Sequence, residues 1–191
     1  MTVEIKIDMA GVIDLSDSIG KLPAEMSSHV VTAVNSIAQS AYETGKRMIV
    51  SQVNLSRDKV DSKMRIDLAS ESYPTAIITA NGRGTLLSNF GAKQLTKPSA
   101  RSKSGVKNAG VSVNIKPSGA PGVIERGFFM RLKTNGAIGV FARDQAGRVR
   151  IRYGPSVDQV FQGVAKDISP QVEIDLQNEL LSELDKITVA I

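Results

Sequence analysis

Basic side chains are the residues of this sequence whose number and spacing suggest a binding chemistry. Fourteen of the 24 Lys and Arg residues lie in residues 81–152, where only Glu125 and Asp144 are acidic, so this stretch has a net charge of +12. Residues 1–80 have a net charge of −2 and residues 153–191 one of −5. A basic middle between acidic flanks indicates a protein that presents one face to an anionic partner, or to an acidic surface of a second copy.

The candidate contact residues are the basic side chains of two stretches within this middle part. Residues 91–110 are rich in Gly, Ala, Ser, Lys, Asn and Pro and contain no acidic residue, which predicts a long mobile loop. The second stretch is a predicted strand around residue 150. The candidates are Lys93, Lys97, Arg101, Lys103, Lys107, Arg148, Arg150 and Arg152.

The basic loop has two interpretations. Clustered Lys and Arg can neutralise the phosphates of a nucleic acid, and because residues 91–110 contain no aromatic side chain for base stacking, such a contact would be with the backbone. Alternatively, the segment is a docking arm that becomes ordered on an acidic partner surface. We favour docking.

Catalytic and metal-binding chemistry find little support in the residue types. The chain has no cysteine, which excludes a thiolate metal site and a cysteine nucleophile, and its one histidine, His29, falls within a predicted helix. Residues 81–84, Asn-Gly-Arg-Gly, lack the Lys-Ser/Thr ending of a phosphate-binding loop and predict a hairpin turn instead. We therefore expect that the protein is not an enzyme and uses no cofactor or metal ion.

Composition also bounds the environment and the core. No stretch approaches the ~20 consecutive apolar residues that a membrane span needs, and the N-terminus lacks the pattern of a signal peptide, so we expect a soluble protein without membrane contact. Aromatic residues make up only 4% of the chain, so the core is expected to consist mainly of Val, Ile, Leu, Ala and Met. Among the few aromatics, Phe141 is predicted to be buried.

Apolar residues three or four positions apart predict helices at both ends of the chain. The longest is expected over residues 24–50, and shorter helices are expected over residues 14–22 and 56–64. A further apolar stripe predicts a helix over residues 157–168. Pro170 is expected to end it and to start a separate last helix.

Between residues 64 and 153 the apolar period changes to two, as it does in residues 3–7, which predicts strands. The change of period predicts an α+β fold, with a long N-terminal helix and C-terminal helices packed on a mainly antiparallel central sheet that carries long basic loops. We expect a single domain over residues 1–191. Its parts would be an N-terminal strand and helices (1–63), the sheet with the basic loop (64–153), and the C-terminal helices (154–191).

Short motifs follow one another in a set order between Phe90 and Phe161. A basic Gly/Ser stretch and an alternating strand lead to Gly127-Phe128-Phe129-Met130. Then come Gly139-Val140-Phe141-Ala142-Arg143, a basic strand, and Gly154-Pro155-Ser156-Val157 before a helix. This order, together with a long N-terminal helix and a Leu/Glu-rich C-terminal helix, resembles the minor tail protein Z and tail-completion proteins of long-tailed bacteriophages.

The resemblance implies a structural virion protein that completes the phage tail at the head–tail junction. It implies a homo-oligomeric ring, with six copies, that joins the tail tube or tail terminator protein to the head connector proteins. The protein would be made in the host cytoplasm and would end up in the neck region of the virion, where DNA passing through the lumen is a further, non-specific contact. The alternative function is a stand-alone nucleic-acid-binding module that contacts the DNA backbone. The oligomeric state in solution, with and without DNA, separates the two.

Overall fold

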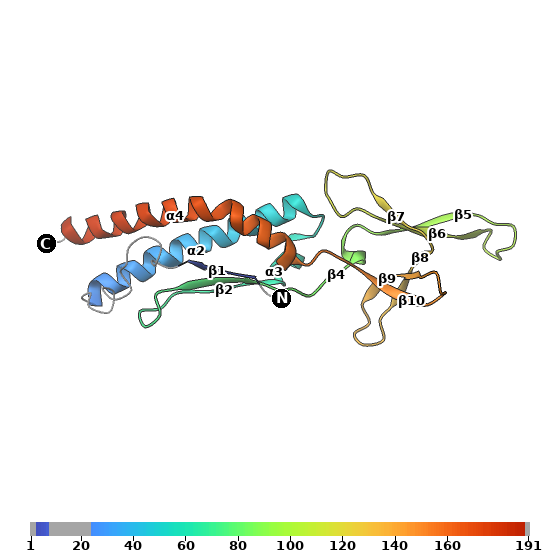
Figure 1. Cartoon of the computed structure of the whole chain (residues 1–191), viewed down its shortest axis with the longest axis horizontal. Helices are drawn as coiled ribbons and strands as arrows, with labels where there is room; N and C mark the ends of the chain where they lie inside the picture. Colours follow the sequence, from blue (N-terminus) through green and yellow to red (C-terminus); the bar gives the residue numbers. More distant parts are fainter. Residues whose placement is uncertain (1–2, 8–23, 190–191) are drawn as a thin grey trace.

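The computed structural model describes residues 3–7 and 24–189 and shows an elongated molecule with two lobes (Figure 1). The helix expected over residues 14–22 lies outside the described residues. One end of the molecule, the helical lobe, contains two long helices, one short helix and a three-stranded sheet. These elements are β1 (Val3–Ile7), α2 (Ala24–Gln52), α3 (Arg57–Asp61), β2 (Met64–Asp67), β3 (Ala76–Ala80) and α4 (Val157–Val189).

The other end, the β lobe, is built from residues 85–154. Its elements are β4 (Thr85–Leu86), the 3₁₀ helix η2 (Leu87–Asn89), β5 (Lys93–Pro98), β6 (Val106–Val113), β7 (Gly122–Ile124), β8 (Gly127–Arg131), β9 (Ile138–Arg143) and β10 (Val149–Gly154). The sheet orders are β1-β3-β2, β4-β10-β9-β8 and β5-β6-β7, and every described strand pair is antiparallel. The α+β class is confirmed. The strands form three small sheets instead of one central sheet, because they are short and pair mostly with their near neighbours in the chain.

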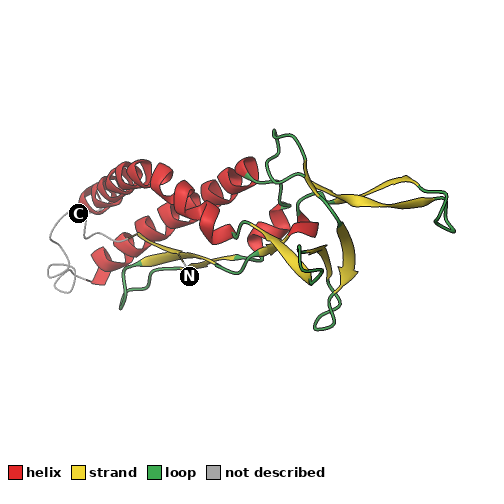
Figure 2. Ribbon diagram, turned by 45° about the vertical axis from the view of Figure 1, so that its right-hand side comes forward, coloured by secondary structure: helices red, strands yellow, loops and turns green. Residues whose placement is uncertain are grey.

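The long helices lie side by side, run in opposite directions and cover one face of the sheet β1-β3-β2 (Figure 1, Figure 2). β3 alternates buried Ala76, Ile78 and Ala80 with partly exposed Ile77 and Thr79, so its buried face is the one that meets the helices. The helices contribute a buried apolar stripe that includes Val30, Val34, Ala38, Ala41, Ile49, Phe161, Val164 and Ile168. The long N-terminal helix is thus confirmed by α2.

The C-terminal region is one helix, so our prediction of two helices separated at Pro170 is wrong. Proline in a helix interior removes one backbone hydrogen bond and costs about 3 kcal/mol. Pro170 lies on the exposed side of α4, while Ile168 before it and Leu176 after it are buried in the core cluster. Packing on both sides of the proline therefore holds the two halves of α4 in one continuous helix.

The basic segment at residues 91–110 is a β-hairpin, so our expectation of a long mobile loop is wrong. β5 pairs with β6 along its whole length, with one irregularity after Leu95. The side-chain amide of Gln94 donates to the carbonyl oxygen of Gly110 at 2.6 Å. Gly110 has a φ of +121°, and a Cβ there would lie only 2.6 Å from the carbonyl oxygen of Ile124 in β7. The prediction failed because it relied on composition. Backbone hydrogen bonds between the strands hold this hairpin together, and a segment rich in Lys, Ser and Gly does not have the composition that is typical of strands.

The remaining strand predictions agree with the structure. The expected hairpin on either side of residues 144–147 is β9 and β10, which pair from Val149 opposite Arg143 to Arg152 opposite Val140. Phe141 is buried, as predicted, with 9% of its surface exposed. Its ring stacks on that of Phe128 in β8, with 6.3 Å between the ring centroids. The β lobe therefore has an aromatic contact of its own.

The two lobes meet at a well-packed junction. The ring of Phe90, which is fully buried, lies against the backbone of Gly154, where a Cβ would approach Cε2 of the ring to 2.5 Å. After α2, the backbone N–H of Asn54 donates to the carbonyl of Ile115 at 2.8 Å, and its side-chain amide donates to the carbonyl of Asn114 at 3.0 Å. One hydrophobic cluster includes residues of both lobes.

Candidate functional site

The hairpin β5–β6 projects from the β lobe at the end of the molecule opposite the C-terminal part of α4 (Figure 1, Figure 2). Five of the predicted contact residues lie on it and all five are exposed. They are Lys93, Lys97, Arg101, Lys103 and Lys107. None of them forms an ion pair with an acidic side chain among the residues that the structure describes. The hairpin is therefore an uncompensated positive projection.

The tip of the hairpin is an ordered turn. The backbone N–H of Ser99 donates to the carbonyl of Gly105 at 2.8 Å, and the N–H of Gly105 donates to the carbonyl of Ser102 at 3.0 Å. Gly105 has a φ of +72°, which glycine adopts at little cost. These bonds hold Arg101 and Lys103 at the tip.

Two of the lysines face each other across the strands. Lys97 is directly opposite Lys107 in the register of β5 and β6. Like charges in directly opposed positions destabilise a strand pair, by roughly the 0.2–1 kcal/mol that a favourable pair contributes. An anionic group placed between the two ammonium groups would remove this repulsion. The hairpin is thus suited to contact phosphates or carboxylates.

The second group of candidates, on and next to β10, has a different electrostatic environment. Nε of Arg148 lies 3.1 Å and Nε of Arg150 3.3 Å from Oδ2 of Asp144, and the backbone N–H of Arg148 donates to Oδ1 at 2.9 Å. The backbone hydrogen bond lowers the pKa of Asp144, and the two guanidinium groups lower it further. Arg152 is exposed and has no acidic partner among the described residues. The single carboxylate of Asp144 therefore offsets only part of the charge of Arg148 and Arg150, whereas Arg152 has no compensating acid among the described residues.

The two groups of candidates do not belong to one sheet. The hairpin residues lie in the sheet β5-β6-β7, whereas Arg150 and Arg152 lie in the sheet β4-β10-β9-β8. The basic character of the middle part of the chain is thus distributed over the β lobe and is not concentrated in one site.

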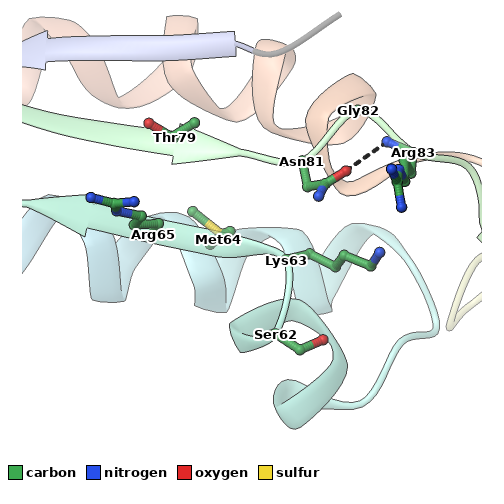
Figure 3. Close-up of a pocket in the computed structure, with 8 residues that line it drawn as sticks. All are labelled: Ser62, Lys63, Met64, Arg65, Thr79, Asn81, Gly82 and Arg83. Carbon is green, nitrogen blue, oxygen red and sulfur yellow. Dashed lines mark hydrogen bonds between the residues drawn. The ribbon is translucent and has the colours of Figure 1, made fainter.

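A further basic feature was not predicted. A surface hollow of about 540 Å³ lies at the end of the β2–β3 pair, beside α3, and Figure 3 shows Lys63 and Arg83 toward one end of it and Arg65 toward the other. In the turn that follows β3, the backbone N–H of Arg83 donates a hydrogen bond of 2.9 Å to the side-chain oxygen of Asn81, which stabilises the turn. Arg65 pairs with Asp67, while Lys63 and Arg83 have no acidic partner in the described part of the chain.

The register of β2 and β3 explains why the sequence did not reveal this hollow. Met64 pairs with Ala80, and the backbone N–H of Asn81 donates to the carbonyl of Lys63 at 2.8 Å. Lys63 and Arg83 are 20 positions apart in the sequence, and Lys63 belongs to the part with a negative net charge. An alternation of cations along residues 63–65 was the one available signal, and it does not identify the partner strand.

The described side chains contain no group of His, Cys, Asp and Glu suited to hold a metal ion. His29 lies 2.6 Å from Oε2 of Glu183, so the single histidine joins α2 to α4. Nor is any helix within the described residues long and apolar enough to pass through a bilayer. The features with binding chemistry are the exposed basic surfaces of the β lobe and the hollow beside α3.

This α+β fold presents exposed basic surfaces that are suited to contact with an anionic partner. Comparison with protein families identifies the family of this chain. The family model of prophage minor tail protein Z (GPZ) matches residues 15–188, and the chain belongs to this family. The predicted resemblance is thereby confirmed, and the chain is a structural protein of a phage tail. Searches of the curated proteins and of the solved structures found no match.

Proposed function

We propose that the protein is a ring-forming adaptor that completes the phage tail at the head–tail junction. In this proposal about six copies form a ring between the tail tube or tail terminator protein and the head connector proteins. Membership of the minor tail protein Z family supports a role in the tail, and the projecting basic hairpin is the observation that carries the adaptor role. A projection with unbalanced charge at one end of an elongated subunit is suited to reach a neighbouring component.

The hairpin contacts an anionic surface, which is either an acidic face of a neighbouring tail or head protein or the backbone of DNA in the lumen. Because β5 and β6 are paired without a partner, the contact surface is preformed, and binding does not require a disordered arm to fold. A preformed strand pair with Lys97 opposite Lys107 favours an acidic protein face or a row of phosphates equally, so salt dependence is needed to separate them.

The test is to replace Lys97, Arg101, Lys103 and Lys107 together by Gln. These side chains are exposed, so the variant should keep its thermal stability, because solvated surface charges contribute little to folding. We expect fewer joined, infectious particles, while heads and tails still form separately. The matched control replaces four exposed cations outside the hairpin by Gln: Arg47, Arg126, Lys133 and Lys166. Normal joining by the hairpin variant, or an equal defect in the control, would contradict the proposal.

Salt then separates the two partners. If the hairpin binds duplex DNA, the logarithm of the binding constant should fall with the logarithm of salt concentration with a slope of about −0.9 for each phosphate neutralised. A largely desolvated contact between proteins should respond less, because ions screen it poorly. A different result would support the stand-alone nucleic-acid-binding module: a DNA-binding constant that falls steeply with salt concentration, and a protein that is monomeric with and without DNA.

A further inference from the structure

An apolar groove in the β lobe has no occupant among the described residues. It has a volume of about 370 Å³ and is lined by side chains from η2, β6, β7, β10 and the segment after β6. The large apolar side chains of its lining are Leu87, Val113, Ile115, Val123, Ile124 and Tyr153. Three of these are exposed to an extent that is unusual for large apolar residues: Ile115 by 37%, Val123 by 55% and Tyr153 by 54%. Lys116 adds a cation to the lining.

The outward side of α4 carries the complementary feature. Ile174 and Leu181 are seven residues apart, which places them on one side of the helix, and they are 52% and 62% exposed. Asp167 and Asp185 are exposed and extend the same line by a turn or two at either end. The opposite side of α4 is buried through Leu176 and Leu180. We call Ile174, Leu181 and the two aspartates the outer stripe of α4.

The groove and the outer stripe cannot meet within one molecule. From Val157, at the junction of the lobes, α4 runs away from the β lobe, so its second half lies at one end of the molecule and β7 lies toward the other (Figure 1). Burial of apolar surface of this kind is favourable, and no element among the described residues of the same chain covers either surface.

We propose that the outer stripe of α4 in one copy docks into the β-lobe groove of the next copy. The occupant is a second copy because the charges match. Residues 81–152, which hold all of the groove lining except Tyr153, have a net charge of +12, and residues 153–191, which hold α4, have one of −5. Locally, Lys116 in the groove would face one of the two aspartates that flank Ile174 and Leu181, because these aspartates lie at opposite ends of the stripe. The proposal deepens the ring proposed above and rests on it for its biological role.

The two halves of this contact are different surfaces, so the contact is head-to-tail. Each copy then offers a free groove at one end and a free stripe at the other, and addition of copies continues until a ring closes or a filament grows. A two-fold dimer, in which the same patch meets itself, is not expected.

The test uses two half-interface variants, Val123→Glu in the groove and Leu181→Glu on the stripe. Each puts a carboxylate into an apolar contact, and each should weaken self-association by at least about tenfold. Leu68→Glu is the matched control, because Leu68 is 48% exposed and lies on neither surface. Thermal unfolding of each variant establishes that it is folded, and light scattering after size-exclusion chromatography gives the mass.

The decisive sample is the mixture. Val123→Glu retains a normal stripe and Leu181→Glu retains a normal groove, so the mixed variants should form a one-to-one dimer and nothing larger. Wild type and Leu68→Glu should form assemblies larger than a dimer. The proposal is overturned if wild type remains monomeric, if either single variant assembles like wild type, or if the mixture stays monomeric.

The outcome is distinguishable from that of the proposed function. If these variants lose assembly in solution but particles still join normally, the contact is correct and the adaptor role is wrong. If they assemble normally and the hairpin variant still blocks joining, the adaptor role stands and this contact is wrong.

Discussion

At the scale of single residues, Glu183 is a carboxylate buried between the two long helices. Only 6% of its surface is exposed, its Oε2 lies 2.6 Å from Nδ1 of His29, and its Oε1 accepts a hydrogen bond from Lys186. The hydrogen bond with His29, followed by that with Lys186, lowers the pKa of Glu183 below its ordinary value of 4.5. The ionised form is therefore favoured by the folded state.

This pairing predicts a specific sensitivity to acid. A carboxylate with a lowered pKa adds stability that is fully present above its ordinary pKa and is lost as the pH falls through the folded-state value. Between about pH 6 and about pH 3, the unfolding temperature of wild type should fall further than that of Glu183→Gln, which has no carboxylate to protonate. Circular dichroism melts at several pH values measure this. Glu173→Gln, at an exposed position of the same helix, should behave like wild type. Equal acid dependence of Glu183→Gln and wild type would contradict the prediction.

At the scale of elements, the hairpin β5–β6 combines ordered pairing with internal repulsion. Lys97 faces Lys107 in the outer part of the hairpin, where the side chains of both strands are exposed. A protein that needed this hairpin only for stability would gain from an opposite charge at one of these positions. The repulsion is consistent with a surface that binds an anionic partner at some cost in its own stability.

Replacing one of the two lysines by an acidic residue should stabilise the hairpin and weaken its binding to an anionic partner. In Lys107→Glu, a cross-strand pair with Lys97 should stabilise the hairpin by roughly 0.2–1 kcal/mol and slow hydrogen exchange of the amides of β5 and β6. The same variant should bind less strongly to the anionic partner. Lys103→Glu, in the turn, makes the same change of charge without a cross-strand partner and should not slow exchange. Unchanged or faster exchange in Lys107→Glu would show that the repulsion has no energetic effect.

At the scale of the whole molecule, we infer that the two lobes fold as one unit. A single hydrophobic cluster includes Val34 and Phe161 of the helical lobe and Phe90, Val111 and Val140 of the β lobe. The Phe90 ring lies against Gly154 where β10 leads into α4, and it leaves no room there for a Cβ atom. The junction therefore holds the hairpin in a defined position relative to the helices.

A methyl group at position 154 should damage this junction. In Gly154→Ala, a Cβ 2.5 Å from Cε2 and 2.9 Å from Cζ of Phe90 must displace a fully buried ring. Overpacking of this kind costs about 1–3 kcal/mol, which urea unfolding would measure as a lower midpoint. The control is Gly163→Ala in α4, where a Cβ meets nothing within 4 Å and the helix should gain about 0.5–1 kcal/mol. A midpoint for Gly154→Ala at or above that of wild type would contradict the packing seen here.

Local periodicity and composition were sufficient to predict several features of this protein. Repeats of three and four predicted the extent of α2, and alternation predicted β2. β-Forming residues predicted β3, and the turn at residues 144–147 predicted the hairpin of β9 and β10. The count of charges predicted the basic β lobe between acidic helices. The order of motifs from Phe90 to Phe161 was sufficient for the family, which the match over residues 15–188 confirms. Each of these signals lies in residues close together in the chain, so no knowledge of distant contacts is required.

Tertiary structure decided what depends on contacts between distant residues. Packing on α2 keeps α4 continuous through Pro170, and pairing with β6 makes strands of a segment whose composition is typical of a loop. For the candidate site, exposure of the hairpin cations was predictable, but their register was not. The placement of Lys63 and Arg83 at one hollow could not be predicted from local spacing, because the register of β2 and β3 brings these two side chains together. The contacts of Asp144 with Arg148 and Arg150 span only a few residues, but they depend on how the turn between β9 and β10 folds.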